Sequence, residues 1–100
     1  MYKTTRTTVD NISRTPILAP EDCNNYALYF EPDGTFPSGA EIMVRTDGND
    51  ATTEKKLPAG SQETLAVPNY ELKKRFLKNT TVVTVQMVPA GTGTVVATFS

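Results

Sequence analysis

The feature of this 100-residue sequence that most limits its fold is a pair of alternating apolar segments near its C-terminal end, residues 81–88 and 94–99. Residues two positions apart point to the same face of a strand, so this period indicates half-buried strands. Residues 89–93 contain one proline and two glycines and predict a turn between the segments. We therefore expect a hairpin that supplies much of the core, with an apolar face made of Val83, Val85, Met87, Val95, Ala97 and Phe99.

Three earlier segments also favour strands: residues 26–30, 41–46 and 64–67. In the second of them, Ile42 and Val44 fall on the same face of the strand. The connecting segments are rich in glycine and proline, which predict turns. Several short strands separated by such turns indicate a mainly β domain, either an antiparallel β-sandwich or a small barrel.

One segment, residues 69–77, favours a short helix. Asn69 can cap its first turn, and Leu72 and Phe76 lie four positions apart, which places them on one helical face. The segment is short for a helix, so an irregular loop is the alternative. We expect at most one short helix in the protein.

The first 24 residues differ from the rest because they are polar, rich in threonine and interrupted by Pro16 and Pro20. Such a chain buries too little apolar surface to offset its ordering entropy, about 1–2 kcal/mol per residue. We interpret residues 1–24 as an extended N-terminal arm that becomes ordered on a partner, followed by a β domain at residues 25–100. The alternative is that this segment supplies an integral strand of the sandwich. The expected contact residues of the arm are Tyr2, Thr5, Arg6, Val9, Ile17 and Leu18.

The composition argues against several classes of function. The chain has no histidine and a single cysteine, Cys23, so the commonest general base, the commonest metal ligand and an internal disulfide are all missing. A net charge of −1 gives no overall field that would attract nucleic acid. No apolar run reaches the roughly 18 residues expected of a membrane-spanning helix, and the first residues lack the apolar centre of a signal peptide. We expect no catalytic residue, no cofactor and no metal.

Acidic residues in predicted turns are the remaining candidates for chemistry. Two carboxylates can carry out acid–base catalysis, but Asp33, Asp47 and Asp50 lie in turns, where carboxylates usually bond to their own backbone. Residues 47–50, Asp-Gly-Asn-Asp, also suggest calcium, although they supply few ligands and lack the distal glutamate of the helix-loop-helix calcium motif. We favour a hairpin turn or a longer loop here and keep calcium as the alternative.

A basic cluster lies in and beside the predicted helix, next to the aromatic residues Tyr70 and Phe76. Cations interleaved with aromatic rings suit single-stranded nucleic acid. The simpler interpretation is a solvated face, or a salt-bridged contact with an acidic neighbour, because the net charge adds no supporting field. We therefore regard a nucleic-acid partner as the weaker interpretation of Lys73, Lys74, Arg75 and Lys78.

From residue 38 onward the segments follow a definite order. A strand that ends in a polar turn (SGAEIMVRTDGNDAT) is followed by a proline-alanine-glycine turn and a strand (LPAGSQETLAV). After a polar-aromatic stretch come the segment NTTVVTVQMV, a Gly-Thr turn and a terminal strand. This order resembles a loose group of small virion structural proteins of tailed bacteriophages. The resemblance implies a β-sandwich that decorates or stabilises the phage head, or joins parts of the head or tail.

On this resemblance we expect a capsid decoration (cement) protein. Its partner would be the major capsid protein or another virion protein, bound as a homo-oligomer or as part of a larger assembly. The protein would be made in the host bacterial cytoplasm and located in the virion. The alternatives are a head–tail, tail or fibre component, and a small β-barrel nucleic-acid-binding protein.

Overall fold

The computed structural model describes residues 3–31, 35–59 and 67–100, and for residues 67–74 it describes the backbone alone. These residues form strands and one short 3-10 helix, and they contain no helix long and apolar enough to cross a membrane. The elements are β1 (Lys3–Val9), β2 (Thr15–Leu18), β3 (Cys23–Glu31), β4 (Glu41–Arg45), η1 (Ala51–Thr53), β5 (Glu54–Pro58), β6 (Val67–Phe76), β7 (Thr81–Val88) and β8 (Gly93–Phe99).

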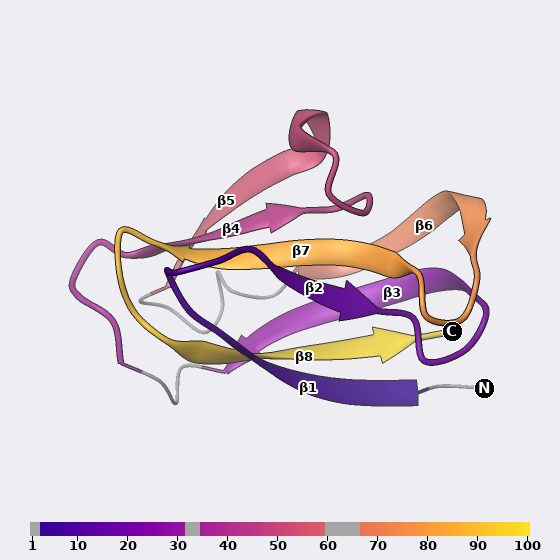
Figure 1. Ribbon diagram of the computed structural model, residues 1–100, viewed down its shortest axis with the longest axis horizontal. Coiled ribbons are helices and arrows are strands. Elements are labelled where there is room, and N and C mark those ends of the chain that lie inside the picture. Colours follow the sequence, from indigo (N-terminus) through magenta and orange to yellow (C-terminus); the bar gives the residue numbers. More distant parts are fainter. Residues whose placement is uncertain (1–2, 32–34, 60–66) are drawn as a thin grey trace.

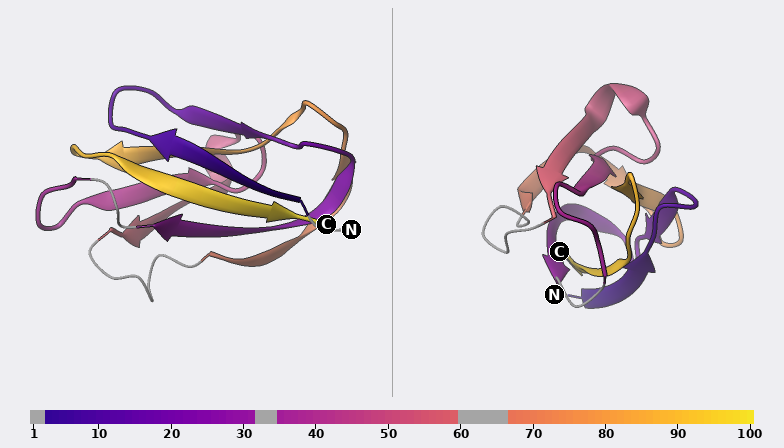
Figure 2. Two further views of the ribbon diagram at one scale, coloured as in Figure 1. Left: turned by 90° about the horizontal axis from the view of Figure 1, so that it is seen from below. Right: turned by 90° about the vertical axis from the view of Figure 1, so that its left-hand side faces the viewer.

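The strands form two four-stranded sheets that pack face to face (Figures 1 and 2). Sheet A has the order β1-β8-β3-β6, and sheet B has the order β2-β7-β4-β5. Every pairing within them is antiparallel. The expected fold class, a mainly β antiparallel sandwich, is confirmed.

The pairing follows one rule along the chain. The first strand pairs with the last, β2 with β7, β3 with β6, and β4 with β5. The chain is therefore equivalent to one long hairpin of four strand pairs, and successive pairs lie alternately in sheet A and sheet B. An eight-stranded double sheet wound in this way is a jelly roll.

The core lies between the sheets and follows the period of two. In β3 the buried residues Tyr26, Leu28 and Phe30 alternate with partly exposed ones, because a central strand of a sandwich turns only one face inward. All six residues of the expected apolar face are at most 3% exposed: Val83, Val85, Met87, Val95, Ala97 and Phe99.

The predicted helix at residues 69–77 is wrong. Residues 67–76 form strand β6, which pairs with β3 at positions that include Tyr26 opposite Tyr70. A helix of this length is only marginally stable by itself. As a strand, the same segment gains backbone hydrogen bonds to the neighbouring strand β3. Val67, the last residue of the strand expected at 64–67, is the first residue of β6, and residues 64–66 lie outside the described ranges.

The predicted hairpin between residues 81–88 and 94–99 is also wrong, although both segments are strands. β7 belongs to sheet B and β8 to sheet A, so the turn between them carries the chain from one sheet to the other. Both strands therefore contribute to the core, but from opposite sides.

Residues 1–24 do not form an arm separate from a domain at 25–100. All seven residues of β1 pair with β8 in an unbroken register, and β2 pairs with β7. Val9 is fully buried and Ile17 is 2% exposed, so the segment is part of the core. The structure therefore agrees with the alternative, in which this segment supplies integral strands. A polar segment can do so because an edge strand is held by backbone hydrogen bonds to its neighbour and needs few apolar residues of its own.

Candidate interaction surfaces

The structure describes five of the six contact residues that the sequence suggested, and it separates those five. Tyr2 lies outside the described ranges. Val9 and Ile17 are core residues and offer no surface, which corrects their assignment. Thr5 is half-buried and Arg6 exposed on β1, and the 46% exposed Leu18 lies at the end of β2, in the other sheet. The fold therefore does not bring the five described residues together as one contact surface.

The outer face of sheet A is a polar array built across three strands. The register places Thr4 and Thr8 of β1 opposite Thr98 and Thr94 of β8, and the hydroxyls of Thr4 and Thr98 are 3.3 Å apart. A period of two explains this face, because the alternate residues of β8 are buried. Threonine suits it, being β-branched and able to form hydrogen bonds.

One ion pair crosses this array. Arg6 of β1 donates to the carboxylate of Glu31 on β3, so the two side chains reach across β8, which lies between their strands. Tyr29 and Val96, paired across β3 and β8, are partly exposed on the same face. The face thus combines hydroxyl groups, one compensated ion pair and a small apolar centre.

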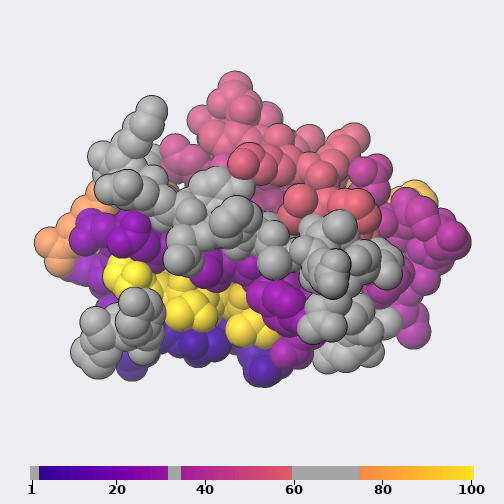
Figure 3. Space-filling view, turned by 180° about the vertical axis from the view of Figure 1, so that it is seen from behind, coloured from indigo at the N-terminus to yellow at the C-terminus, as the bar shows by residue number. Residues whose placement is uncertain are grey.

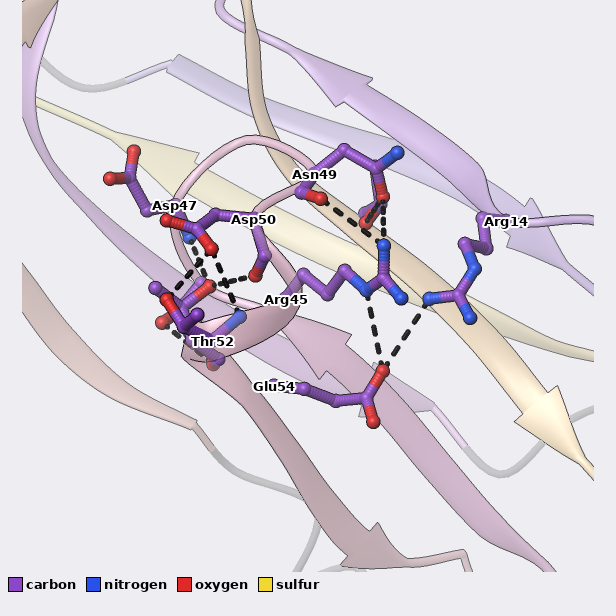
Figure 4. Close-up of polar contacts among 10 residues, drawn as sticks. Arg14, Arg45, Asp47, Asn49, Asp50, Thr52 and Glu54 are labelled. Carbon is purple, nitrogen blue, oxygen red and sulfur yellow. Dashed lines mark hydrogen bonds and ion pairs between the residues drawn. The ribbon is translucent and has the colours of Figure 1, made fainter.

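The outer side of sheet B carries a denser network (Figure 4). The Nε of Arg45 donates to Glu54 Oε1 over 3.3 Å, and its Nη1 donates to the backbone and side-chain oxygens of Asn49 over 3.1 and 2.9 Å. The hydroxyl of Thr84 donates to the same side-chain oxygen over 3.2 Å. Arg14 lies 3.4 Å from Glu54 and joins the network at its rim. These bonds hold the loop at residues 46–53 against strand β7.

The loop at residues 46–53 is the longer of the two connections that the sequence left open. Asp50 caps the short helix η1, because its side chain accepts from the backbone N and the hydroxyl of Thr52 over 2.9 and 2.7 Å. Gly48, at φ +61°, donates its backbone N–H to Val82 over 2.7 Å. Glycine reaches this positive φ without steric cost, which lets the loop fold back onto β7.

The calcium alternative gains no support from this loop. The hydrogen bonds of Asp50 are those of a cap, and they correspond to the predicted use of turn carboxylates. Within residues 3–31, 35–59 and 67–100, no group of three or more His, Cys, Asp and Glu side chains could hold a metal ion.

The described core holds little free space. Between the sheets, an apolar crevice of about 10 Å³ has room for at most one water molecule. It is lined by Leu28, Tyr29, Phe30, Ile42, Val44, Leu57, Val85 and Val95. An open depression of about 320 Å³ lies at the end of the sandwich, between residues 35–37 and 90–91. Neither site gathers titratable groups, so both are described best as packing features.

The basic cluster is partly engaged within the chain. Arg75 Nη2 lies 2.7 Å from Asp22 Oδ2, and the backbone N of Lys78 donates to the other oxygen of Asp22 over 3.0 Å. The side chains of Lys73 and Lys74 lie outside the described part. The neighbouring Cys23 is buried, and its pKa is raised by that burial and by the nearby carboxylates of Asp22 and Glu21.

Sequence reasoning missed the network on sheet B. The alternation that buries Ile42 and Val44 leaves Arg45 on the outward face of β4, but its pairing with Glu54 depends on the register between β4 and β5. Arg14 is 40 positions from Glu54, and no local pattern links the two. Glu54 begins β5, a segment that the sequence did not indicate as a strand, so no pattern in the sequence placed these charges together.

No family model and no curated protein sequence matches the chain. Among solved structures, it is similar to a chain in the acidic stable capsid structure of Helicobacter pylori bacteriophage KHP30, with 14% sequence identity and a TM-score of 0.45. The alignment covers 100% of this chain and 94% of that chain. Likeness at this level carries no argument about function. The class of the protein follows from its own strand order: it is a double-sheet jelly-roll domain.

Proposed function

We propose that this protein is a structural component of a bacteriophage virion. The observation that carries the proposal is the jelly-roll strand order, an architecture of viral capsid and lectin domains. One fold can serve several functions, so the strand order alone is not sufficient. The second support is the resemblance of residues 38–100 to small virion proteins of tailed phages. The proposed role is not catalytic, in line with a sequence that has no histidine.

Within that role, we favour a capsid decoration protein that binds and stabilises the head through protein–protein contacts. Two broad sheet faces, one rich in threonine and one tied by an arginine network, suit contact with protein surfaces. The partner would be the major capsid protein or another virion protein, and the protein would be located in the virion. A head–tail, tail or fibre component is the alternative within the same class.

A quantitative inventory of purified particles tests the role. Mass spectrometry should find the protein in a fixed ratio to the major capsid protein, and antibody labelling should place it on heads rather than tails. Particles made without it should lose DNA at a lower temperature than complete particles, and added protein should restore them. Labelling confined to the tail would favour the alternative, and absence from intact particles would contradict the whole proposal.

A nucleic-acid-binding β-barrel remains the second candidate because Arg75 and Lys78 lie on the surface beside Lys73 and Lys74 in the sequence. That function predicts binding to an oligonucleotide that weakens steeply as salt rises. The Arg75–Asp22 pair already uses one of these cations, which argues against it. A filter-binding measurement with single-stranded DNA at two salt concentrations separates the two candidates.

A further inference from the structure

The four outer strands of the sandwich differ in how well their free edges are blocked. An exposed edge presents unpaired backbone groups, and proteins commonly block it with proline, lysine, bulges or a very short strand. β2 has four residues, contains Pro16 and has a register shift at Ile17/Leu18. β5 has the charged run Glu54, Lys55 and Lys56 and ends at Pro58. Each of these two edges therefore carries more than one such feature.

The edge at β6 is blocked in the same way. Its sequence, VPNYELKKRF, contains a proline near its start and a run of three cations near its end. Its pairing with β3 also shifts register twice. Three of the four outer strands thus combine proline or charge runs with irregular pairing or short length.

β1 is the exception. Its seven residues, KTTRTTV, contain no proline, and they pair with β8 without any register shift. It has no second neighbour among the strands that the structure describes, and it lies at the border of sheet A (Figure 2). A regular strand of this length offers a template for one more strand.

We propose that the free edge of β1 accepts an extended, acidic strand from a partner protein. The positive charge of β1 favours an acidic partner strand over a second copy of β1. β1 carries Lys3 and Arg6 and no acidic residue, so a second copy of β1 would bring four cations together. A strand with glutamate or aspartate near these positions would instead be attracted to them.

Two side chains of β1 could form bonds with such an acidic strand. Arg6 is 61% exposed in its side chain although it binds Glu31, so its guanidinium remains accessible to a second carboxylate. On the inner side, the buried hydroxyl of Thr5 has no hydrogen-bond partner among the residues that the structure describes. A buried polar group of this kind is unusual, and a side chain of an added strand could supply the missing bond.

The proposal deepens the structural role proposed above and rests on it for the source of the strand, which would be a neighbouring virion protein. Its test uses the isolated full chain and a labelled peptide of about nine residues, in which valine and threonine alternate and two glutamates are included. A peptide with lysine in place of both glutamates is the control. We expect the acidic peptide to bind roughly tenfold more tightly than the basic one.

Charge reversal identifies the edge that is used. Lys3→Glu should weaken binding of the acidic peptide roughly tenfold, whereas Lys56→Glu, the same change on the exposed and blocked edge β5, should leave it unchanged. Equal effects of the two substitutions would overturn the proposal, because peptide binding would then depend on the net charge of the protein and not on the edge of β1.

Proline substitution tests the backbone contact. Alternate N–H groups of an edge strand point away from the sheet, so of Thr4→Pro and Thr5→Pro one removes an internal bond and the other removes an outward N–H. The variant whose melting temperature is less affected should lose peptide binding. Retained binding in both variants would contradict the proposal.

Amide hydrogen exchange distinguishes the remaining outcomes. Added acidic peptide should protect β1 and leave β2 and β5 unchanged. If β1 is protected in the free protein and sedimentation shows a dimer, a second copy of the chain occupies the edge. That result would overturn the proposal of an acidic partner strand. Peptide binding by a protein that is absent from purified particles would contradict the virion role while supporting the edge.

Discussion

β1 and β8 lie side by side in sheet A and have the same length, yet they bury very different amounts of apolar surface. Alternate residues of β8 are buried from Gly93 to Phe99, whereas the one buried residue of β1 is Val9. The same contrast separates β7 from β2, in which Ile17 is the buried residue. In each pair the strand with two neighbours buries several apolar side chains, whereas the outer strand buries only one.

The position of a strand in its sheet explains this contrast. A central strand faces the opposite sheet along its whole length, and each buried aliphatic side chain contributes about 1.5–3 kcal/mol. An outer strand lies over the rim of the sandwich, where partial burial of threonine is sufficient. Its backbone hydrogen bonds to the central strand and one apolar contact hold it in place.

The largest expected effect comes from a charge in a central strand. Val85 of β7 is 1% exposed, so Val85→Asp would bury a carboxylate without a partner and cost several kcal/mol. A domain of this size has a total stability of about 5–15 kcal/mol, so we expect the variant to be largely unfolded by circular dichroism. Val96→Asp, the same change on the partly exposed face of β8, is the matched control and should stay folded.

Removal of an outer strand is the next test. Deleting residues 1–9 removes β1 and the buried side chain of Val9, so we expect the melting temperature to fall by about 10 °C. Differential scanning calorimetry of the two purified chains measures this fall. An unchanged melting temperature would restore the interpretation of this segment as an arm.

Close packing between central strands predicts a smaller loss at Gly93. A Cβ atom added there would lie 1.9 Å from Cζ of Phe30, so Gly93→Ala should destabilise the protein by about 1–3 kcal/mol in urea unfolding. Phe30→Leu removes the atom in conflict, and the double variant should lose less than the sum of the single variants. Simple additivity would mean that this contact is not the cause.

The arginine network compares a central and an outer position directly. Arg45 lies on the central strand β4 and is 15% exposed, whereas Arg14 precedes the outer strand β2 and is 38% exposed. We expect Arg45→Met to cost about 1 kcal/mol and Arg14→Met a few tenths of that, because solvent screens the outer pair. Equal losses would indicate that exposure does not set the strength of this network.

Cys23 gives the smallest expected effect. Because its thiol pKa is raised in the folded protein, the thiol should react slowly with Ellman's reagent at mildly alkaline pH and rapidly after unfolding. The stability that it contributes is complete below the pKa of the unfolded thiol and is lost as the pH rises through the folded value. Cys23→Ala should therefore flatten the alkaline fall in stability, and an identical pH profile would contradict this.

The contrast between central and outer strands also explains which predictions were correct. The segments at 26–30, 41–46, 81–88 and 94–99 were recognised because central strands need alternating apolar residues, and that pattern is local. Residues 69–77 were assigned to a helix because Leu72 and Phe76 are spaced for one, but pairing with β3 outweighed that local preference. For residues 3–9 a strand was only the alternative to an arm, because Val9 is their one apolar side chain.

The candidate surfaces were less accessible to sequence reasoning than the core. The grouping of Arg14, Arg45 and Glu54 depends on strand register and on a loop that folds back over β7, and both arise from long-range contacts. The use of Asp50 as a cap was predictable, since the preference of aspartate for turns is a property of the residue itself.

The residues alone were sufficient for the class of fold, the central strands and their buried faces, because side-chain alternation and turn chemistry act over a few neighbouring positions. The tertiary structure was needed to assign β7 and β8 to different sheets, to make strands of residues 3–9 and 67–76, and to leave β1 as the unblocked edge. These features depend on which backbone groups meet across the sandwich, and such pairing is selected by the whole chain when it buries one shared core.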